Sequence, residues 1–182
     1  MAHELTTSYL RDSLTVFHYY KKLAERATEQ VTDEQLFAVL DGEMNSIAII
    51  VKHLVGNMRS RWTDFLISDG EKPDRKRDTE FENPPATRAE LMRLWDEGWN
   101  YVFTALEPMS DADLGRRVEI RGEPHSVMQA INRQIAHYAY HCGQIVFLAK
   151  HLQAKQWKPL TVPRGKSEEF NQRVAAKEIS QR

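Results

Sequence analysis

The chain has 182 residues, of which 41% are hydrophobic and 28% are charged, and its formal net charge is -1. This length and composition are typical of one globular domain with a sizeable core. A charge so close to zero gives no general attraction to nucleic acid or to an anionic membrane, and no apolar run approaches the roughly 18 residues that a membrane-spanning helix needs.

Two helix-period patterns occupy the first third of the chain. The first runs from about residue 6 to 28, and a threonine or serine at positions 6–8 can cap its start. The second runs from about residue 33 to 68, begins at Thr32 or Asp33, and carries an apolar stripe from Leu40 to Phe65. Gly42 lies inside this second pattern, so its first turns are either offset or separate.

Two further helix-period patterns follow a long charged link at residues 69–87, which is either an ordered crossover or a mobile loop. The third pattern reaches about residue 106 and begins at Thr87, which forms a capping box with Glu90. Residues 117–120 alternate weakly before a possible turn, which indicates a short strand pair. The fourth pattern covers about residues 126–153, and Ser167 could cap a short last helix.

Four amphipathic helices with one long link predict an all-α fold, a four-helix bundle with a crossover between the second and third helices. We expect a single domain over residues 1–182, with its core at about 5–155 and an irregular tail at 156–182.

His137 and His141, one helical turn apart, are the most informative residues of the chain. Residues at i and i+4 lie on one face of a helix, so their imidazoles can converge on one metal ion. Both lie on one shoulder of their apolar stripe, and His53 lies on the corresponding shoulder of the second pattern. Packing the stripes together leaves these shoulders facing one groove. Three ligands and an open position are typical of catalytic zinc, whereas structural zinc usually has four ligands.

The residues alone leave another interpretation open. A histidine on a semi-apolar face is commonly a hydrogen-bonded structural residue, and an i,i+4 pair can arise by chance. Tyr138 stands where the general-base glutamate of an H-E-x-x-H peptidase would be, which argues against that class. We also find no carboxylate to orient His53, since Glu43 lies ten residues earlier, about 15 Å along a straight helix.

Two segments, MNSIAIIVKHLVGNMRSRWTDFL and SVMQAINRQIAHYAYHCGQIVFLAKHL, resemble the DinB-like superfamily of metalloenzymes. The runs RKRDTEF and PRGKSEEFN resemble one uncharacterised branch of it, and the resemblance covers roughly residues 5–171. It implies a four-helix bundle with a long crossover between helices two and three. It also implies one divalent metal, often zinc or nickel, held by His53, His137 and His141. A further implication is that the protein forms a homodimer.

Characterised relatives in this superfamily transfer low-molecular-weight thiols such as bacillithiol or mycothiol, or isomerise substrates with a thiol cofactor. The resemblance therefore implies a metal-dependent enzyme, above all a thiol S-transferase acting on a small-molecule electrophile. Two alternatives stay open: hydrolysis by a metal-bound hydroxide, and a non-enzymatic metal-binding or stress-related bundle. No catalytic residue other than the metal ligands is indicated.

Four residues are candidates for substrate binding. Arg75 and Arg77, in the mixed-charge run 75–81, suit a carboxylate or phosphate of a cosubstrate, since guanidinium groups bind such anions in a fork. A solvated surface is the alternative for this run. Asn57 and Gln144 could form hydrogen bonds near the metal, although a contact within the bundle is the simpler interpretation.

Cys142 points about 100° away from His141 on a helix, and we predict a small core residue rather than a ligand. A single cysteine fits a reducing compartment, and the N-terminus lacks the pattern of a secretory signal. We therefore expect a cytoplasmic protein without nucleic-acid or membrane partners. The tryptophans Trp62, Trp95 and Trp99 are expected in the core or a dimer interface, and the histidines His3, His18, His125 and His151 in surface or capping positions.

Overall fold

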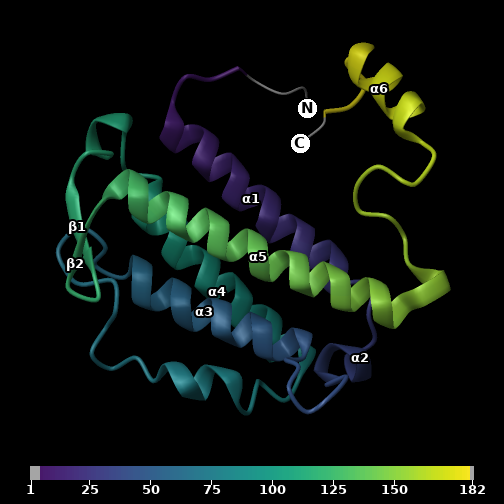
Figure 1. Cartoon of the computed structure of the whole chain (residues 1–182), viewed down its shortest axis with the longest axis horizontal. Helices are drawn as coiled ribbons and strands as arrows, with labels where there is room; N and C mark the ends of the chain where they lie inside the picture. Colours follow the sequence, from purple (N-terminus) through teal and green to yellow (C-terminus); the bar gives the residue numbers. More distant parts are fainter. Residues whose placement is uncertain (1–4, 181–182) are drawn as a thin grey trace.

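The computed structural model describes residues 5–180, and four long helices pack side by side in it (Figure 1). They are α1 (Tyr9–Thr28), α3 (Ile47–Trp62), α4 (Arg88–Leu106) and α5 (Val127–Gln153). Each begins at a side-chain cap that accepts a hydrogen bond from the backbone three residues on, and these caps are Ser8, Ser46, Thr87 and Ser126. The predicted all-α bundle is confirmed.

The second predicted helix is divided, which confirms the separate first turns that Gly42 indicated, whereas the expected end near residue 68 was wrong. A short helix α2 (Asp33–Phe37) begins at the capping box of Thr32, and α3 begins only at Ile47. The connection contains Gly42, which disfavours helix, and Ser46 starts the new helix. Leu40 in this connection is 40% exposed and takes no part in the apolar stripe. The helix α3 ends before Asp64, whose φ of 49° is not helical.

A two-stranded hairpin closes one end of the bundle, as the sequence predicts. It consists of β1 (Arg117–Ile120) and β2 (Glu123–Ser126), which pair antiparallel. Arg121 and Gly122 form the turn with φ values of 57° and 73°, and two positive φ angles are typical of a type I′ turn. Short 3-10 turns follow α4 and α5, η2 (Asp111–Asp113) and η3 (Ala154–Gln156).

The core consists of apolar residues from all four long helices, with α3 packed mainly on α4 and α1 mainly on α5. Aromatic rings meet at its centre. Phe17 contacts the rings of Trp62, Trp99 and Tyr138 at centroid distances of 5.7–6.2 Å, and the indole of Trp62 donates to the hydroxyl of Tyr138 at 2.9 Å. Trp95 is buried beside them, which confirms the core interpretation of the tryptophans.

The crossover between α3 and α4 is ordered and runs along the outer side of α3 (Figure 1). It contains the 3-10 helix η1 (Arg77–Phe81). The Lys52 ammonium on α3 donates to the carbonyls of Thr79 and Glu82 at 2.6 and 2.5 Å. At the other end, the Asp69 carboxylate accepts hydrogen bonds from the backbone of the hairpin turn. These contacts hold η1 against the face of α3 that carries His53.

The tail after α5 follows an extended path to α6 (Ser167–Ala175). Arg26 on α1 donates to the carbonyl of Leu160 at 3.1 Å, which attaches the start of the tail to the bundle. Ser167 is the first residue of α6 rather than its cap, since Lys166 precedes the helix without a side-chain cap bond. Within residues 5–180, no helix has the length and apolarity needed to cross a membrane.

Candidate metal centre

Three imidazoles meet between α3 and α5. His137 and His141 lie one turn apart on α5, and His53 lies on α3. The Nε2 atom of His137 is 3.4 Å from Nε2 of His53 and 3.1 Å from Nε2 of His141. One nitrogen from each ring lies within 4.8 Å of the other two, so the three histidines could hold a metal ion. The structure thus brings together the residues that the sequence placed on facing shoulders.

Glu80 determines which nitrogen of His53 carries the proton. Its carboxylate lies 2.9 Å from Nδ1 of His53. Burial acts to raise the pKa of Glu80, but hydrogen bonds from His53 and Arg75 hold it below its usual value. An ionised carboxylate can only accept a hydrogen bond, so Nδ1 of His53 is the donor. In neutral imidazole, the form that binds metal, the Nε2 atom of His53 then carries the lone pair and faces the other two histidines.

Gln144 has the same effect on His141. Its side-chain oxygen lies 2.7 Å from Nδ1 of His141 and accepts a hydrogen bond from the N–H there. Two Nε2 lone pairs then face the Nε2 atom of His137, which can carry at most one hydrogen. A divalent cation would satisfy all three lone pairs, and neutral imidazole is the form that binds metal. The donor set therefore fits a metal ion.

Burial keeps the imidazole rings of His137 and His141 neutral. Desolvation, together with the proximity of His141 and His53, lowers the pKa of His137 to about 3. Desolvation likewise lowers the pKa of His141 to about 4, although its hydrogen bond to Gln144 acts in the opposite direction. Both side chains are neutral near pH 7, ready to accept a metal without first losing a proton.

Behind Glu80 lies a chain of ion pairs, which is buried at Arg75 and Glu80 and half-exposed at Arg121. Arg75 binds both oxygens of Glu80, at 2.7 and 2.9 Å, and also Glu71 at 3.1 Å. Glu71 in turn accepts hydrogen bonds from Arg61 at 2.8 Å and from Arg121 at 3.3 Å. Bidentate pairs of this kind are strong and directional. The network therefore fixes the carboxylate that orients His53 and connects it to the hairpin turn.

Gly56 makes room for this carboxylate. It lies three residues after His53 on α3, and therefore on the same face. A Cβ atom at Gly56 would clash with the carboxylate of Glu80. Because the glycine leaves the helix backbone bare, Glu80 can approach α3 beside the imidazole.

Glu80 is the site residue that sequence reasoning missed, and the conclusion that no carboxylate could orient His53 was wrong. It comes from the crossover, 27 residues after His53, where helical spacing rules give no information. One signal was present: Phe81, the only apolar residue of the run 75–81, stacks on His53 at a centroid distance of 4.6 Å. An apolar residue in a charged run indicates that the run packs against the bundle.

A cavity of about 510 Å³ opens beside the histidines, and we call it the histidine cavity. All four predicted substrate-binding residues line it. Within residues 5–180, no acidic side chain lines this cavity. Five arginines line it, and they are Arg61, Arg75, Arg77, Arg121 and Arg133. Such a lining favours a molecule that carries an anionic group.

The four candidates have different roles in the structure. Arg75 is engaged with Glu80 and Glu71, and Gln144 orients His141, so both also position other groups. Asn57 is buried and accepts a hydrogen bond from the Tyr138 hydroxyl at 3.2 Å. Arg77 is half-exposed, with its guanidinium 5.2 Å from the centre of the Phe81 ring. Substrate binding stays a prediction for all four.

Two buried polar atoms of the cavity lining have no hydrogen-bond partner within residues 5–180. They are the side-chain oxygen of Gln134 and the Nε atom of Arg61. Buried polar atoms without partners are uncommon in native proteins and usually indicate a bound molecule or water. Neither atom is solvent-accessible, and each keeps an unused hydrogen-bonding capacity in the wall of the cavity.

The remaining cysteine and histidines lie away from the centre. The Cys142 thiol is directed at the carbonyl of Tyr20 at 3.6 Å, and burial raises its pKa to about 12. It is a core residue, as predicted. His18 stacks on Phe103, His125 bonds the carbonyl of Glu123, and His151 is exposed. His3 lies outside the described residues.

Acid should destabilise the metal-free protein. His137 and His141 have lower pKa values in the folded state than the usual 6.5, so the unfolded chain binds more protons below about pH 6.5. The contribution of the two neutral histidines to the free energy of unfolding is therefore fully present above that pH and decreases as the pH drops toward 4. We expect the urea midpoint to decrease between pH 7.5 and 4.5.

A comparison with His137→Ala isolates the histidine contribution to this acid effect, because carboxylates such as Glu80 act in the same direction. The variant should lose less stability than the wild type over the same pH range. Equal losses in the two proteins would contradict the assignment of a buried neutral imidazole at position 137.

Fold and site together define a class: an α-helical bundle with three convergent histidines on two of its helices. The chain belongs to the family described as "Protein of unknown function (DUF1572)", whose model matches residues 4–166. This is a DinB-like family, which confirms the resemblance at that level. Comparison with curated proteins and with solved structures gave no match.

Proposed function

We propose that the protein is a divalent-metal-dependent enzyme that transfers a low-molecular-weight thiol to an electrophile. The observation that carries the proposal is the convergence of three imidazoles on one side of an open, arginine-lined cavity. Three protein ligands beside an open cavity favour a catalytic over a structural metal site. The metal would be zinc or nickel, both of which imidazole suits.

The chemistry follows from the ligand set. When bound, a divalent ion lowers the pKa of a thiol or water at its open positions, and so supplies a nucleophile near neutral pH. Glu80 and Gln144 accept from Nδ1 of His53 and His141, which would leave the Nε2 atoms of both rings free to hold the ion. Outer hydrogen bonds of this kind orient ligands and raise their basicity.

The transfer balances without an oxidant or reductant. The thiol gives up its proton to solvent, its sulfur forms a bond to the electrophilic carbon, and the leaving group departs with the electron pair of the bond that breaks. Where the thiol carries a carboxylate, as bacillithiol does, Arg77 and its neighbours in the histidine cavity would bind this anion.

We further propose a cytoplasmic homodimer that acts on small molecules and has no nucleic-acid or membrane partner. These proposals rest on the DinB-like resemblance, the balanced charge and the single cysteine, which fits a reducing compartment. Sedimentation of the metal-loaded protein tests the oligomeric state, for which a monomer at micromolar concentration is the opposing result.

The test is turnover by zinc- and nickel-loaded protein with a panel of thiols and electrophiles, each reaction run with and without thiol. Thiol-dependent product formation that chelation abolishes supports the proposal. Product formed at the same rate without thiol indicates hydrolysis by a metal-bound hydroxide. Metal bound without any turnover across the panel favours a metal-binding or stress-related bundle that is not an enzyme.

Arg77→Ala should weaken binding of an anionic thiol. The half-exposed residue lines the histidine cavity, so its loss would remove a charge-assisted contact to the thiol worth about 1.5–3 kcal/mol. We expect KM for the thiol to rise roughly 10- to 100-fold at unchanged metal content. The matched control is Arg93→Ala on the outer surface of α4. An unchanged KM in Arg77→Ala would remove this residue from the site.

A further inference from the structure

A second cavity, of about 450 Å³, adjoins the histidine cavity, and we call it the α3–α5 pocket. The two cavities share Asn45, Tyr140 and Gln144 in their linings, so they adjoin along these three residues. Volumes of about 300–1,000 Å³ are typical of sites for small molecules. A molecule that reaches the histidines can therefore extend into the α3–α5 pocket.

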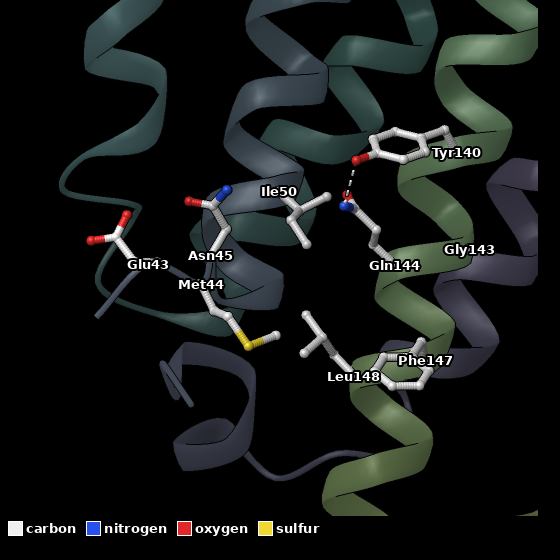
Figure 2. A pocket seen from close by; sticks show the side chains of 9 residues that line it. All are labelled: Glu43, Met44, Asn45, Ile50, Tyr140, Gly143, Gln144, Phe147 and Leu148. Atoms are coloured by element: carbon white, nitrogen blue, oxygen red, sulfur yellow. Dashed lines mark hydrogen bonds between the residues drawn. The ribbon is translucent and has the colours of Figure 1, made fainter. Parts of the chain in front are cut away.

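The two cavities differ in chemistry. Five arginines line the histidine cavity, whereas the side chains of Met44, Ile50, Phe147 and Leu148 line the α3–α5 pocket. Figure 2 shows Met44, Ile50 and Leu148 directed toward one another, while the carboxylate of Glu43 points away from them. The two adjoining cavities are thus polar and cationic at one end and apolar at the other.

Gly143 leaves the α3–α5 pocket open. It lies in the middle of α5, where glycine destabilises a helix by about 1 kcal/mol relative to alanine. Packing explains the glycines at positions 56 and 98, since a Cβ atom at either position would press against a neighbouring side chain. A Cβ at Gly143 would meet nothing within 4 Å. Packing does not explain this glycine, but its place in the pocket wall does.

Gln144 connects the apolar end to the metal centre. Its oxygen accepts from Nδ1 of His141 at 2.7 Å, and its nitrogen donates to the Tyr140 hydroxyl at 3.1 Å. Figure 2 shows this second bond at one end of the pocket. A group bound in the α3–α5 pocket therefore lies next to the side chain that orients a metal ligand.

We propose that the α3–α5 pocket binds an apolar alkyl or aryl group of the electrophilic substrate, whose reacting atom lies in the histidine cavity. Burial of such a group against Met44, Ile50 and Leu148 supplies binding energy remote from the reacting bond. The naming of this group as part of an electrophile rests on the proposed thiol transfer. The binding of an apolar group does not depend on it.

Straight-chain alkanoates test the proposal, because the carboxylate stands in for the polar reacting end and the chain for the apolar group. Binding of acetate, butanoate, hexanoate and octanoate is measured by calorimetry on zinc-loaded and on metal-free protein. Each fully buried methylene contributes a factor of about four in affinity, so octanoate should bind at least roughly tenfold more tightly than butanoate. Methyl NMR of methionine locates the chain: the Met44 signal should shift, and that of Met128, which lines neither cavity, should not.

Gly143→Leu is the decisive variant, because a leucine there would fill the pocket. It replaces a helix-disfavouring residue at a position where an added Cβ meets nothing within 4 Å, so the melting temperature should stay the same or rise. The chain-length dependence should disappear while acetate binding and zinc content stay unchanged. His151→Leu, at an exposed position of α5 outside both cavities, is the matched control and should retain the dependence.

The proposal is overturned if no alkanoate binds, if affinity does not rise with chain length, or if Gly143→Leu retains the rise. Failure of the proposed function gives a different pattern. If the protein binds no zinc or transfers no thiol but still shows the chain-length dependence, the apolar subsite is supported. The assignment as a transferase is then contradicted. Thiol transfer without any chain-length dependence supports the function and removes the subsite.

Discussion

Replacing His137 by alanine should abolish stable metal binding and all metal-dependent activity. Its Nε2 atom is the central one of the three, 3.4 Å from His53 and 3.1 Å from His141. Loss of a direct ligand should reduce metal affinity by more than the roughly 10- to 100-fold typical of an outer hydrogen-bond partner. Zinc at 100 times Kd should stabilise the wild type by about 2.7 kcal/mol and the variant not at all. Metal analysis and zinc-dependent melting measure both effects.

His151→Ala is the matched control for this variant. It removes a histidine from the same helix at an exposed position outside the histidine cavity, and it should bind zinc as the wild type does. His137→Ala should still fold when metal-free, because the half-buried ring is not part of the aromatic core. Wild-type zinc affinity in His137→Ala would contradict the three-histidine site.

Replacing Glu80 by alanine should reduce both stability and metal affinity. Its carboxylate is the bidentate partner of the buried Arg75. Removing one member of a buried ion pair typically costs roughly 3–5 kcal/mol, and we expect a loss near the lower limit because Glu71 still binds Arg75. Metal affinity should fall about 10- to 100-fold, since His53 loses the acceptor that orients it. Urea unfolding of metal-free protein and zinc titration separate the two losses.

Two other variants separate charge from hydrogen bonding at this position. Glu80→Gln keeps an acceptor for His53 but removes the charge opposite Arg75, so it should lose stability while metal affinity falls less than in Glu80→Ala. Gly56→Ala keeps the charge but displaces the carboxylate by steric contact, so it should weaken metal binding. Glu97→Gln, at an exposed ion pair, is the control and should change neither property. Metal affinity unchanged in all Glu80 and Gly56 variants would remove Glu80 from the centre.

The helices and their starting points were predictable because they depend on local interactions. The caps at Thr87 and Ser126 and the turn at Arg121–Gly122 are encoded within a few residues of where they act. The division of the second pattern was only partly predictable. Gly42 indicated an interruption, but the separate cap at Ser46 determines where α3 begins.

The three histidines were predictable because helix geometry places them. The i,i+4 spacing of His137 and His141 fixes a shared face, and the apolar stripes determine how that face meets α3. Glu80 was not predictable in this way. Its position depends on how the crossover folds over α3, through the Lys52 contacts, the Arg75 pair and the gap at Gly56.

The cavities, like the position of Glu80, depend on contacts between residues that are far apart in the sequence. The α3–α5 pocket joins residues from the start of α3 with residues nearly 100 positions later on α5, and its openness depends on a side chain that Gly143 lacks. In the sequence, Gly143 is simply a glycine within a helical pattern, where it weakens the prediction of helix. Only its surroundings in the fold indicate a reason for it.

Zinc titration of metal-free protein, followed by X-ray absorption of the product, tests the metal centre most directly. We predict one zinc ion per chain, coordinated by three imidazole nitrogens at about 2.0–2.1 Å with its remaining position taken by solvent or an added thiol. Zinc that does not bind at micromolar concentration, or that binds with fewer than three imidazole ligands, would contradict a metal centre formed by His53, His137 and His141.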